Sequence, residues 1–188
     1  MRVILLFSVI SLCIAALAAP MIPSLNWTER SDWVNVKTFG AKGDGVADDT
    51  AAIQQAFDGM KEGSTVYLPA GAYRLTKTLS LLGPRHGTLV VGHGRDTKLI
   101  WDGPVGGTMF NEDGIAYCRY VGLLFDGKNK AALGLYHNTN LRFETEVRHQ
   151  NLAFLNFTDT AVLVNPQHKV ASAETLFENC LFENCKRG

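Results

Sequence analysis

Residues 33–82 decide the fold, and they read WVNVKTFGAKGDGVADDTAAIQQAFDGMKEGSTVYLPAGAYRLTKTLSLL. Val34 and Val36 alternate with polar neighbours, which is the period of a half-buried strand. The glycines of the GAKGDG motif, residues 40–45, permit the positive φ angles of a tight reversal. The start of this stretch therefore predicts a short strand followed by a sharp turn.

One amphipathic helix is predicted next, from Asp49 to Lys61. Apolar side chains recur there every three or four residues and form one stripe: Ala52, Ile53, Ala56, Phe57 and Met60. Asp48 or Asp49 is placed to cap this helix, because a carboxylate accepts the free N–H groups of the first turn and suits the helix dipole. A strand over residues 65–70 then turns at Pro69-Ala70-Gly71.

This stretch closely resembles the N-terminal segment of pectate-lyase-like, right-handed parallel β-helix proteins, in the branch with rhamnogalacturonase, polygalacturonase and epimerase-like domains. The resemblance rests on three motifs: FGAKGDG at residues 39–45, DDTAAIQ at residues 48–54, and VYLPAG at residues 66–71. It covers about fifty residues, and a looser repeat pattern continues it beyond Leu82.

The resemblance implies that this segment is structural and that its helix covers the open hydrophobic end of the β-helix. A solenoid needs such an atypical terminal unit, with one polar and one apolar face. We therefore interpret Asp44, Asp48, Asp49 and Thr50 as turn and cap residues. The alternative for the acidic trio is a metal or catalytic role, but turn and cap chemistry already accounts for all three.

Short β-rich runs broken by Gly, Asn and Asp follow, with no second good helix, so the sequence predicts an all-β, right-handed, single-stranded parallel β-helix with one N-terminal capping helix. LIWDG at residues 99–103 matches LLFDG at residues 123–127, a spacing of about 24 residues typical of solenoids. Residues 151–157 (NLAFLNF) read as one strand. The repeated FENC phrase at residues 177–185 reads as two faces of one coil with a corner at Asn179-Cys180.

The domain organisation has three parts. Residues 1–19 are predicted to be a signal peptide, with Arg2 at the start, a short apolar run and a small-x-small pattern before the cleavage point. Residues 20–32 form a linker, and residues 33–188 form the N-terminal part of a β-helix: a strand-turn-helix cap at 33–71 and coils at 72–188. No closing unit follows Cys185, so we expect a truncated β-helix or a partner over the last coil.

Composition narrows the possible partners. The 188 residues carry a formal net charge of zero, which gives no reason to expect nucleic acid or an anionic membrane surface as partner. The hydrophobic fraction of 46% suffices for a sizeable core. The signal pattern predicts a secreted, periplasmic or extracellular location and no membrane association of the mature form.

Asp102 and Asp126 are the best candidates for catalysis. If their strands stack in register, their Cα atoms lie about 5 Å apart, and such closely placed like charges would raise one pKa, a shift that an acid/base pair could use. The alternative is an Asp-Gly turn at the same corner of two coils, continued by Asn156. Gly92-His93-Gly94 resembles a polygalacturonase active-site motif, but it comes early and lacks the accompanying acidic motifs, so we interpret it as a glycine-rich corner.

A charged cluster at residues 142–149 supplies the candidates for substrate binding, Arg142, Arg148 and His149. Such loops on β-helices often line the substrate groove, and a solvated loop with local ion pairs is the alternative. No zinc-type His/Cys spacing and no phosphate-binding loop occurs, so no metal or cofactor is predicted, apart from Ca²⁺ if the protein is a lyase.

Three functions remain open. The first is a secreted glycoside hydrolase or polysaccharide lyase acting on pectin-like or other complex polysaccharides, as the resemblance and the export signal imply. The second is a non-catalytic β-helix, such as an adhesin, a stalk or a glycan-binding module, because fold alone does not establish activity. The third is an inert N-terminal portion that lacks the catalytic coils.

Overall fold

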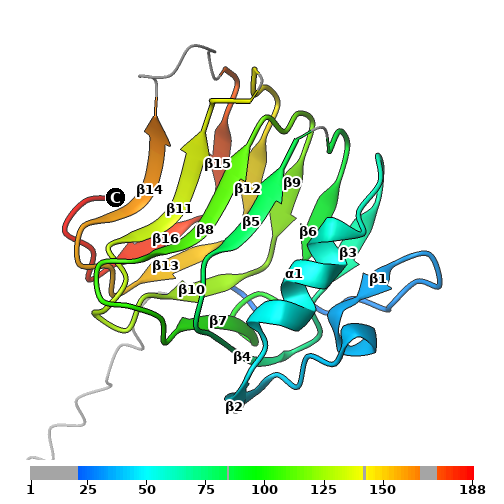
Figure 1. The fold of residues 1–188 in the computed structure, drawn as a ribbon, viewed down its shortest axis with the longest axis horizontal. Coiled ribbons are helices and arrows are strands. Elements are labelled where there is room, and N and C mark those ends of the chain that lie inside the picture. The colour runs from blue at the N-terminus through cyan, green and yellow to red at the C-terminus, as the bar shows by residue number, and fades with distance from the viewer. Residues whose placement is uncertain (1–20, 84, 142, 166–172) are drawn as a thin grey trace, which may run out of the picture.

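The short β-rich runs form a stack of parallel strands. A computed structural model describes residues 21–83, 85–141, 143–165 and 173–188, which wind as a β-solenoid of about five coils (Figure 1). The N-terminal unit contains β1 (Val34–Asn35), the 3₁₀ helix η1 (Val36–Phe39), β2 (Asp44–Asp48) and α1 (Thr50–Asp58). The coils follow as β3 (Thr65–Tyr67), β4 (Gly71–Leu75), β5 (Leu79–Leu82), β6 (Leu89–Val91), β7 (Thr97–Trp101), β8 (Thr108–Asp113), β9 (Arg119–Val121), β10 (Leu124–Asp126), β11 (Leu133–Asn138), β12 (Arg148–Gln150), β13 (Ala153–Leu155), β14 (Thr160–Asn165), β15 (Leu176–Glu178) and β16 (Leu181–Glu183).

Each of the four coils from β3 to β14 contributes one strand to each of three parallel sheets, while β1, β2, β15 and β16 extend the first two sheets. The first sheet has the order β1-β3-β6-β9-β12-β15, the second β16-β13-β10-β7-β4-β2, and the third β14-β11-β8-β5. Consecutive strands of the chain lie in different sheets, so every hydrogen-bonded neighbour comes from the coil before or after. The predicted parallel β-helix is therefore confirmed.

Inward side chains stack in columns along the solenoid. Phe125, Phe154 and Phe182 are register partners in the second sheet. Their rings stack nearly parallel, with centroids 5.0 and 5.4 Å apart. Because similar side chains stack on one another in successive coils, the core is continuous along the solenoid and needs no second layer of elements.

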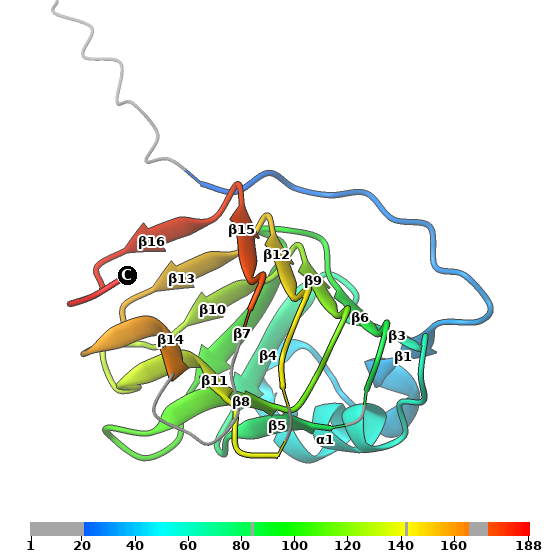
Figure 2. The same ribbon diagram turned by 90° about the horizontal axis from the view of Figure 1, so that it is seen from above.

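Helix α1 occupies the place that a strand of the third sheet would take in the first coil, beside β5 (Figures 1 and 2). Its apolar stripe, which includes the buried Ile53 and Phe57, faces the open end of the core. The side-chain amide of Gln54 substitutes for strand backbone: Oε1 accepts from Ser80 N at 2.8 Å and Nε2 donates to Ser80 O at 2.9 Å. The capping role predicted for the helix is therefore confirmed.

The acidic residues of the cap differ in detail from the prediction. Helix α1 spans Thr50–Asp58, shorter than predicted, and its N-cap Asp49 makes no side-chain capping bond. Instead the Asp49 carboxylate accepts from Lys42 N and Gly43 N, at 2.6 and 3.0 Å, and holds the glycine-rich turn. Asp48 accepts from Thr50 N at 3.1 Å and so caps the helix, while Asp44 accepts from Val46 N and Ala47 N within β2, both at 2.9 Å.

We expect Gln54→Leu to lower the free energy of unfolding by about 1–3 kcal/mol, because both backbone groups of Ser80 lose their partner at a partly buried sheet edge. Gln55→Leu is the matched control, since Gln55 lies on the exposed side of the same helix. Urea denaturation followed by tryptophan fluorescence measures both values. Equal destabilisation of the two variants would contradict the edge-pairing role.

Asparagine residues with left-handed backbone make the corners. Asn151 and Asn179 have φ values of 53° and 52° and join the first sheet to the second. Asn156, with φ of 60°, leads out of the second sheet, so the predicted single strand at 151–157 is instead the short β13 between two corners. The predicted corner at Asn179 within the FENC repeat is confirmed.

Residues 21–32, predicted as a linker, run along the outside of the solenoid (Figure 2). Leu25 N donates to His93 O at 3.1 Å, and Trp27 Nε1 donates to Gly92 O at 2.7 Å. The His93 ring bonds Leu25 O through Nδ1 at 2.7 Å and the Tyr67 hydroxyl through Nε2 at 2.6 Å. His93 thus anchors this segment, which agrees with a structural corner. Among the described residues no helix is long and apolar enough to cross a membrane.

Candidate functional site

Two neighbouring hollows lie on the outer face of the second sheet, and we call them together the outer groove. The first has a volume of about 310 Å³ and is lined by Gly45, Arg74, Ile100, Trp101, Asp102, Lys128 and Lys130. The second has a volume of about 270 Å³ and is lined by Met21, Arg95, Asp96, Lys98, Leu124, Asp126 and Leu155. Both take residues from β7 and from β10 or the corner after it, so they follow one another along these strands.

The outer groove is positively charged. Its basic side chains outnumber its acidic ones, with Arg74, Arg95, Lys98, Lys128 and Lys130 against Asp96, Asp102 and Asp126. These cations belong to strands or corners of three successive coils. They are staggered along the sheet and are not register partners, since Arg74 lies beside Ile100 and Lys98 lies beside Ala72 and Leu124. A row of cations on a rigid sheet suits a polyanionic chain that lies along it.

Asp102 is held between two of these cations. Its carboxylate lies 2.7 Å from Lys130 Nζ and 2.8 Å from the Arg74 guanidinium. The hydrogen bonds from Lys130 and then Arg74 lower the pKa of Asp102 below its usual value. A carboxyl group held in its ionised form positions cations and is poorly suited to donate a proton as a general acid.

Asp126 does not stack on Asp102, so the predicted pair of adjacent carboxylates is wrong. The register partner of Asp126 on β7 is Ile100. Strand β7 runs on to Trp101, one residue past the partner of Asp126, so Asp102 lies two residues beyond the level of Asp126. Asp126 instead accepts from Lys128 N and from the Asn156 side chain, both at 2.9 Å. Asp126 is thus a corner residue, and Asn156 occupies the corresponding corner of the next coil, as the alternative interpretation of the sequence proposed. A catalytic role for either aspartate stays a prediction.

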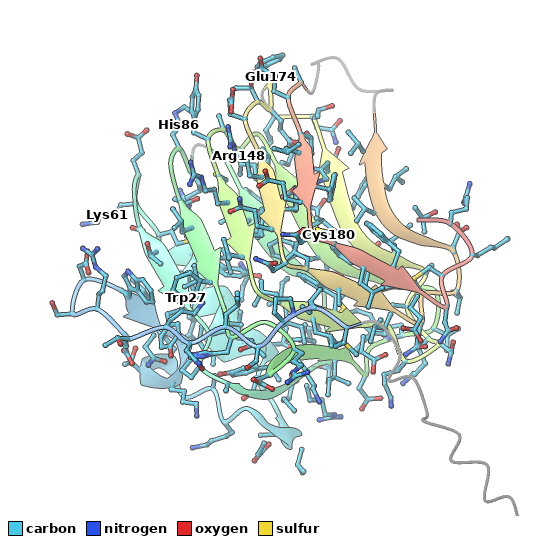
Figure 3. All side chains as sticks on the ribbon, turned by 180° about the vertical axis from the view of Figure 1, so that it is seen from behind. Trp27, Lys61, His86, Arg148, Glu174 and Cys180 are labelled. Carbon is cyan, nitrogen blue, oxygen red and sulfur yellow. The ribbon has the colours of Figure 1, made fainter. Side chains whose placement is uncertain are left out.

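The residues predicted to bind substrate do not share one site. Arg142 lies outside the described residues. Arg148 is half-exposed on the first sheet, 3.3 Å from Glu146 and away from the outer groove; Figure 3 labels it near Glu174. His149 is fully buried, so its predicted place in a substrate groove is wrong. Residues 148–150 form strand β12 rather than a loop, and alternation turns His149 inward between two polar neighbours.

A second cluster, which the sequence did not reveal, lies inside the solenoid around His149. Glu112, His137 and Glu144 are fully buried beside it. The His137 Nδ1 atom contacts the Glu112 carboxylate and lies 3.3 Å from Glu144 Oε2. One sequence signal could have revealed this cluster. Its Glu and His residues occupy inward-facing positions of alternating strands, which are normally apolar.

The buried charges shift one another's pKa values. Burial acts to lower the pKa of His137, but the adjacent Glu112 carboxylate outweighs it and the pKa rises to about 9. Burial, followed by repulsion from His137, lowers the pKa of His149 to about 3. Burial also raises the pKa of Glu144. The cluster therefore holds one histidine charged and one neutral at neutral pH.

A three-sheet parallel solenoid, capped by one helix and carrying a charged groove on one sheet, defines the class of parallel β-helix proteins. Within that class the chain belongs to the family described as rhamnogalacturonase A/epimerase, pectate lyase-like, whose model matches residues 33–185. This is a family of carbohydrate-active β-helix proteins.

Individual relatives match only in part. The chain is 66% identical over 44 residues to mannuronan C5-epimerase AlgE1 of Azotobacter vinelandii, a match that covers 22% of this chain and 3% of the epimerase. Among solved structures, ORF18 of Geobacillus virus E2 has a TM-score of 0.67 and 19% identity, covering 84% of this chain and 40% of that one. The Agl-KA catalytic domain has a TM-score of 0.62 and 15% identity, covering 90% and 35%. These two likenesses show the fold alone.

Proposed function

We propose that this chain is a secreted carbohydrate-active protein that binds an acidic polysaccharide along the outer groove. The observation that carries the proposal is the row of cations on the second sheet, with Asp102 fixing Arg74 and Lys130 in place. Two further points support it: the family, and the close match of 44 residues to an epimerase whose name specifies mannuronan, a polyuronate. The signal-like residues 1–19 support export.

The proposed ligand follows from the chemistry of the groove. Uronate carboxylates repeat along the chain of such a polysaccharide, and ammonium or guanidinium groups spaced along a strand can pair with them. Exposed ion pairs of this kind are individually weak, so several cations must act together. Binding should therefore favour polymers over monomers and fall as salt screens the charges.

We expect Lys98→Gln/Lys128→Gln to weaken binding of polymannuronate or polygalacturonate about fivefold to tenfold at low salt, because each exposed ion pair contributes about 0.2–1 kcal/mol. Both lysines are exposed and line the groove. Isothermal titration calorimetry measures the change, and neutral dextran serves as the ligand that should not bind.

The matched control is Lys61→Gln. Lys61 is exposed and lines neither hollow. It follows helix α1 at the capped end of the solenoid, and Figure 3 labels it there. It should leave the dissociation constant unchanged. If the wild-type chain binds dextran as well as polyuronate, or if Lys61→Gln weakens binding as much as the double variant, the outer groove is not the polyuronate site.

The reaction, if the chain carries one out, is that of a hydrolase, a lyase or another uronate-modifying enzyme. A non-catalytic glycan-binding module or adhesin is the second candidate, and one observation favours it: Asp102 is ion-paired and Asp126 belongs to a corner. Incubation with a polysaccharide panel distinguishes the two. Reducing ends released without unsaturated ends indicate hydrolysis, and unsaturated ends indicate lyase chemistry. A changed uronate composition in the NMR spectrum of an uncleaved polymer indicates another modifying enzyme, and binding with an unchanged polymer supports the module.

A further inference from the structure

One layer of the solenoid interior is polar, while its neighbours are apolar. On the third sheet Glu112 of β8 is the register partner of His137 of β11, and Leu81 precedes Glu112 in the same column. Val164 follows His137. Two successive coils thus place an acid over a histidine at positions where the flanking coils have aliphatic residues, so packing alone does not account for the pair.

The third member comes from the facing sheet. His149 of β12 lies in an aromatic column between Tyr120 and Phe177, with ring centroids 5.2 and 4.4 Å away and nearly parallel planes. Across the interior the His137 ring lies edge-on to it, with centroids 5.0 Å apart and an interplanar angle of 76°. A phenylalanine ring at position 149 would stack in this column equally well. The imidazole therefore differs from it chiefly by its two ring nitrogen atoms.

Most of these nitrogen and oxygen atoms lack hydrogen-bond partners. Oε2 of Glu112, Nε2 of His137 and both ring nitrogens of His149 are buried and make no hydrogen bond. Oε1 of Glu112 makes none either, although it contacts Nδ1 of His137 as an ion pair. Burying polar groups in this way costs free energy unless something binds them, and native interiors rarely leave several such atoms together. Their concentration in one place points to a ligand that accepts lone pairs and whose binding displaces the proton that Glu112 holds on His137.

We propose that Glu112, His137 and His149 bind one divalent transition-metal ion, with Zn²⁺ as the best match, inside the solenoid. One ligand atom from each residue lies within 4.8 Å of the others, and Zn²⁺ bonds to histidine nitrogen and carboxylate oxygen are about 2.0–2.2 Å long. Binding would require side-chain rotations that bring three such atoms around one ion. Mixed nitrogen and oxygen donors argue against Ca²⁺ and Mg²⁺, which prefer oxygen ligands.

Charge and burial indicate a structural site. Glu144 is buried, and its Oε2 lies 3.3 Å from His137 Nδ1, so it is the nearest candidate for a fourth ligand or for a carboxylate that orients the imidazole. Two carboxylates would balance the two charges of the ion. All four residues are fully buried, so the ion would join three successive coils and two sheets without access to a polysaccharide substrate.

The first test uses the untagged full chain and the metal alone. After exhaustive dialysis against a chelator, the chain should take up one equivalent of Zn²⁺ in calorimetry, and Co²⁺ should give the intense visible bands of a tetrahedral site. The thermal midpoint should rise with Zn²⁺ and fall back on chelation, because an ion bound only by the native state stabilises it. If neither ion binds and chelation leaves the midpoint unchanged, the site does not exist.

His149→Phe is the decisive variant, because it preserves the aromatic column and removes the ligand. We expect its Zn²⁺ affinity to fall at least about a hundredfold while its circular dichroism stays native. His86→Phe is the matched control, since His86 is exposed at the surface. Zn²⁺ binding by His149→Phe that is as tight as that of the wild type would overturn the proposal. Should His149→Phe not fold, the wild-type Co²⁺ spectrum and metal stoichiometry decide alone.

Discussion

Gly134→Ala is expected to lower the free energy of unfolding by about 3 kcal/mol, at the upper end of the usual cost of overpacking. Gly134 lies in β11, where an added Cβ would overlap the carbonyl oxygen of Ala161 and come within 2.9 Å of Phe157 Cζ. The Phe157 ring is buried, and Gly127 also lies against it, so the ring has little room to move. Urea denaturation and thermal melting both measure the loss.

Gly59→Ala is the matched control for this prediction. Gly59 ends helix α1 with φ of −77°, a conformation open to any residue, and the nearest atom to its added Cβ is Gln55 O at 3.4 Å. Alanine there should be neutral or stabilising by about 0.4–1 kcal/mol, since it restricts the unfolded chain. A Gly134→Ala midpoint equal to that of the wild type would show that β11 and β14 can separate without cost.

The sequence predicts the parts of this fold that depend on local chemistry. The amphipathic stripe of α1 requires only the helical period, and the glycines of the 40–45 turn and Asn179 require only a left-handed backbone. The length of a corner is different. It depends on where each strand ends relative to the coil above, so matching the two LxxDG phrases misplaced Asp102 by two residues relative to Asp126.

The candidate sites were harder to predict, for a related reason. Arg74 and Lys130 lie 28 positions from Asp102 on either side, and only the register of three coils brings their side chains to its carboxylate. Glu112 and His137 likewise come from different coils. A prediction based on spacing finds metal ligands that lie within one loop or helix, and it has no access to donors that meet across the interior of a solenoid.

Phe154→Ala is expected to have the largest effect on stability, a loss of about 3–5 kcal/mol, because it removes a fully buried ring and leaves a cavity. Phe154 lies in the middle of the aromatic column of the second sheet. Its ring stacks on Phe125 at 5.0 Å and on Phe182 at 5.4 Å, both nearly parallel. The loss should appear as a lower urea midpoint, read from the fluorescence of the buried Trp101.

Phe182→Ala separates stacking from burial. Phe182 occupies the next coil of the same column, but it is 40% exposed. Its removal leaves an indentation that water can fill, so we expect a loss of about 1–2 kcal/mol. The two variants delete the same atoms, and the difference between them therefore measures what enclosure by coils on both sides adds. Equal losses would mean that the ring stack, and not the closed interior, supplies the stability of the column.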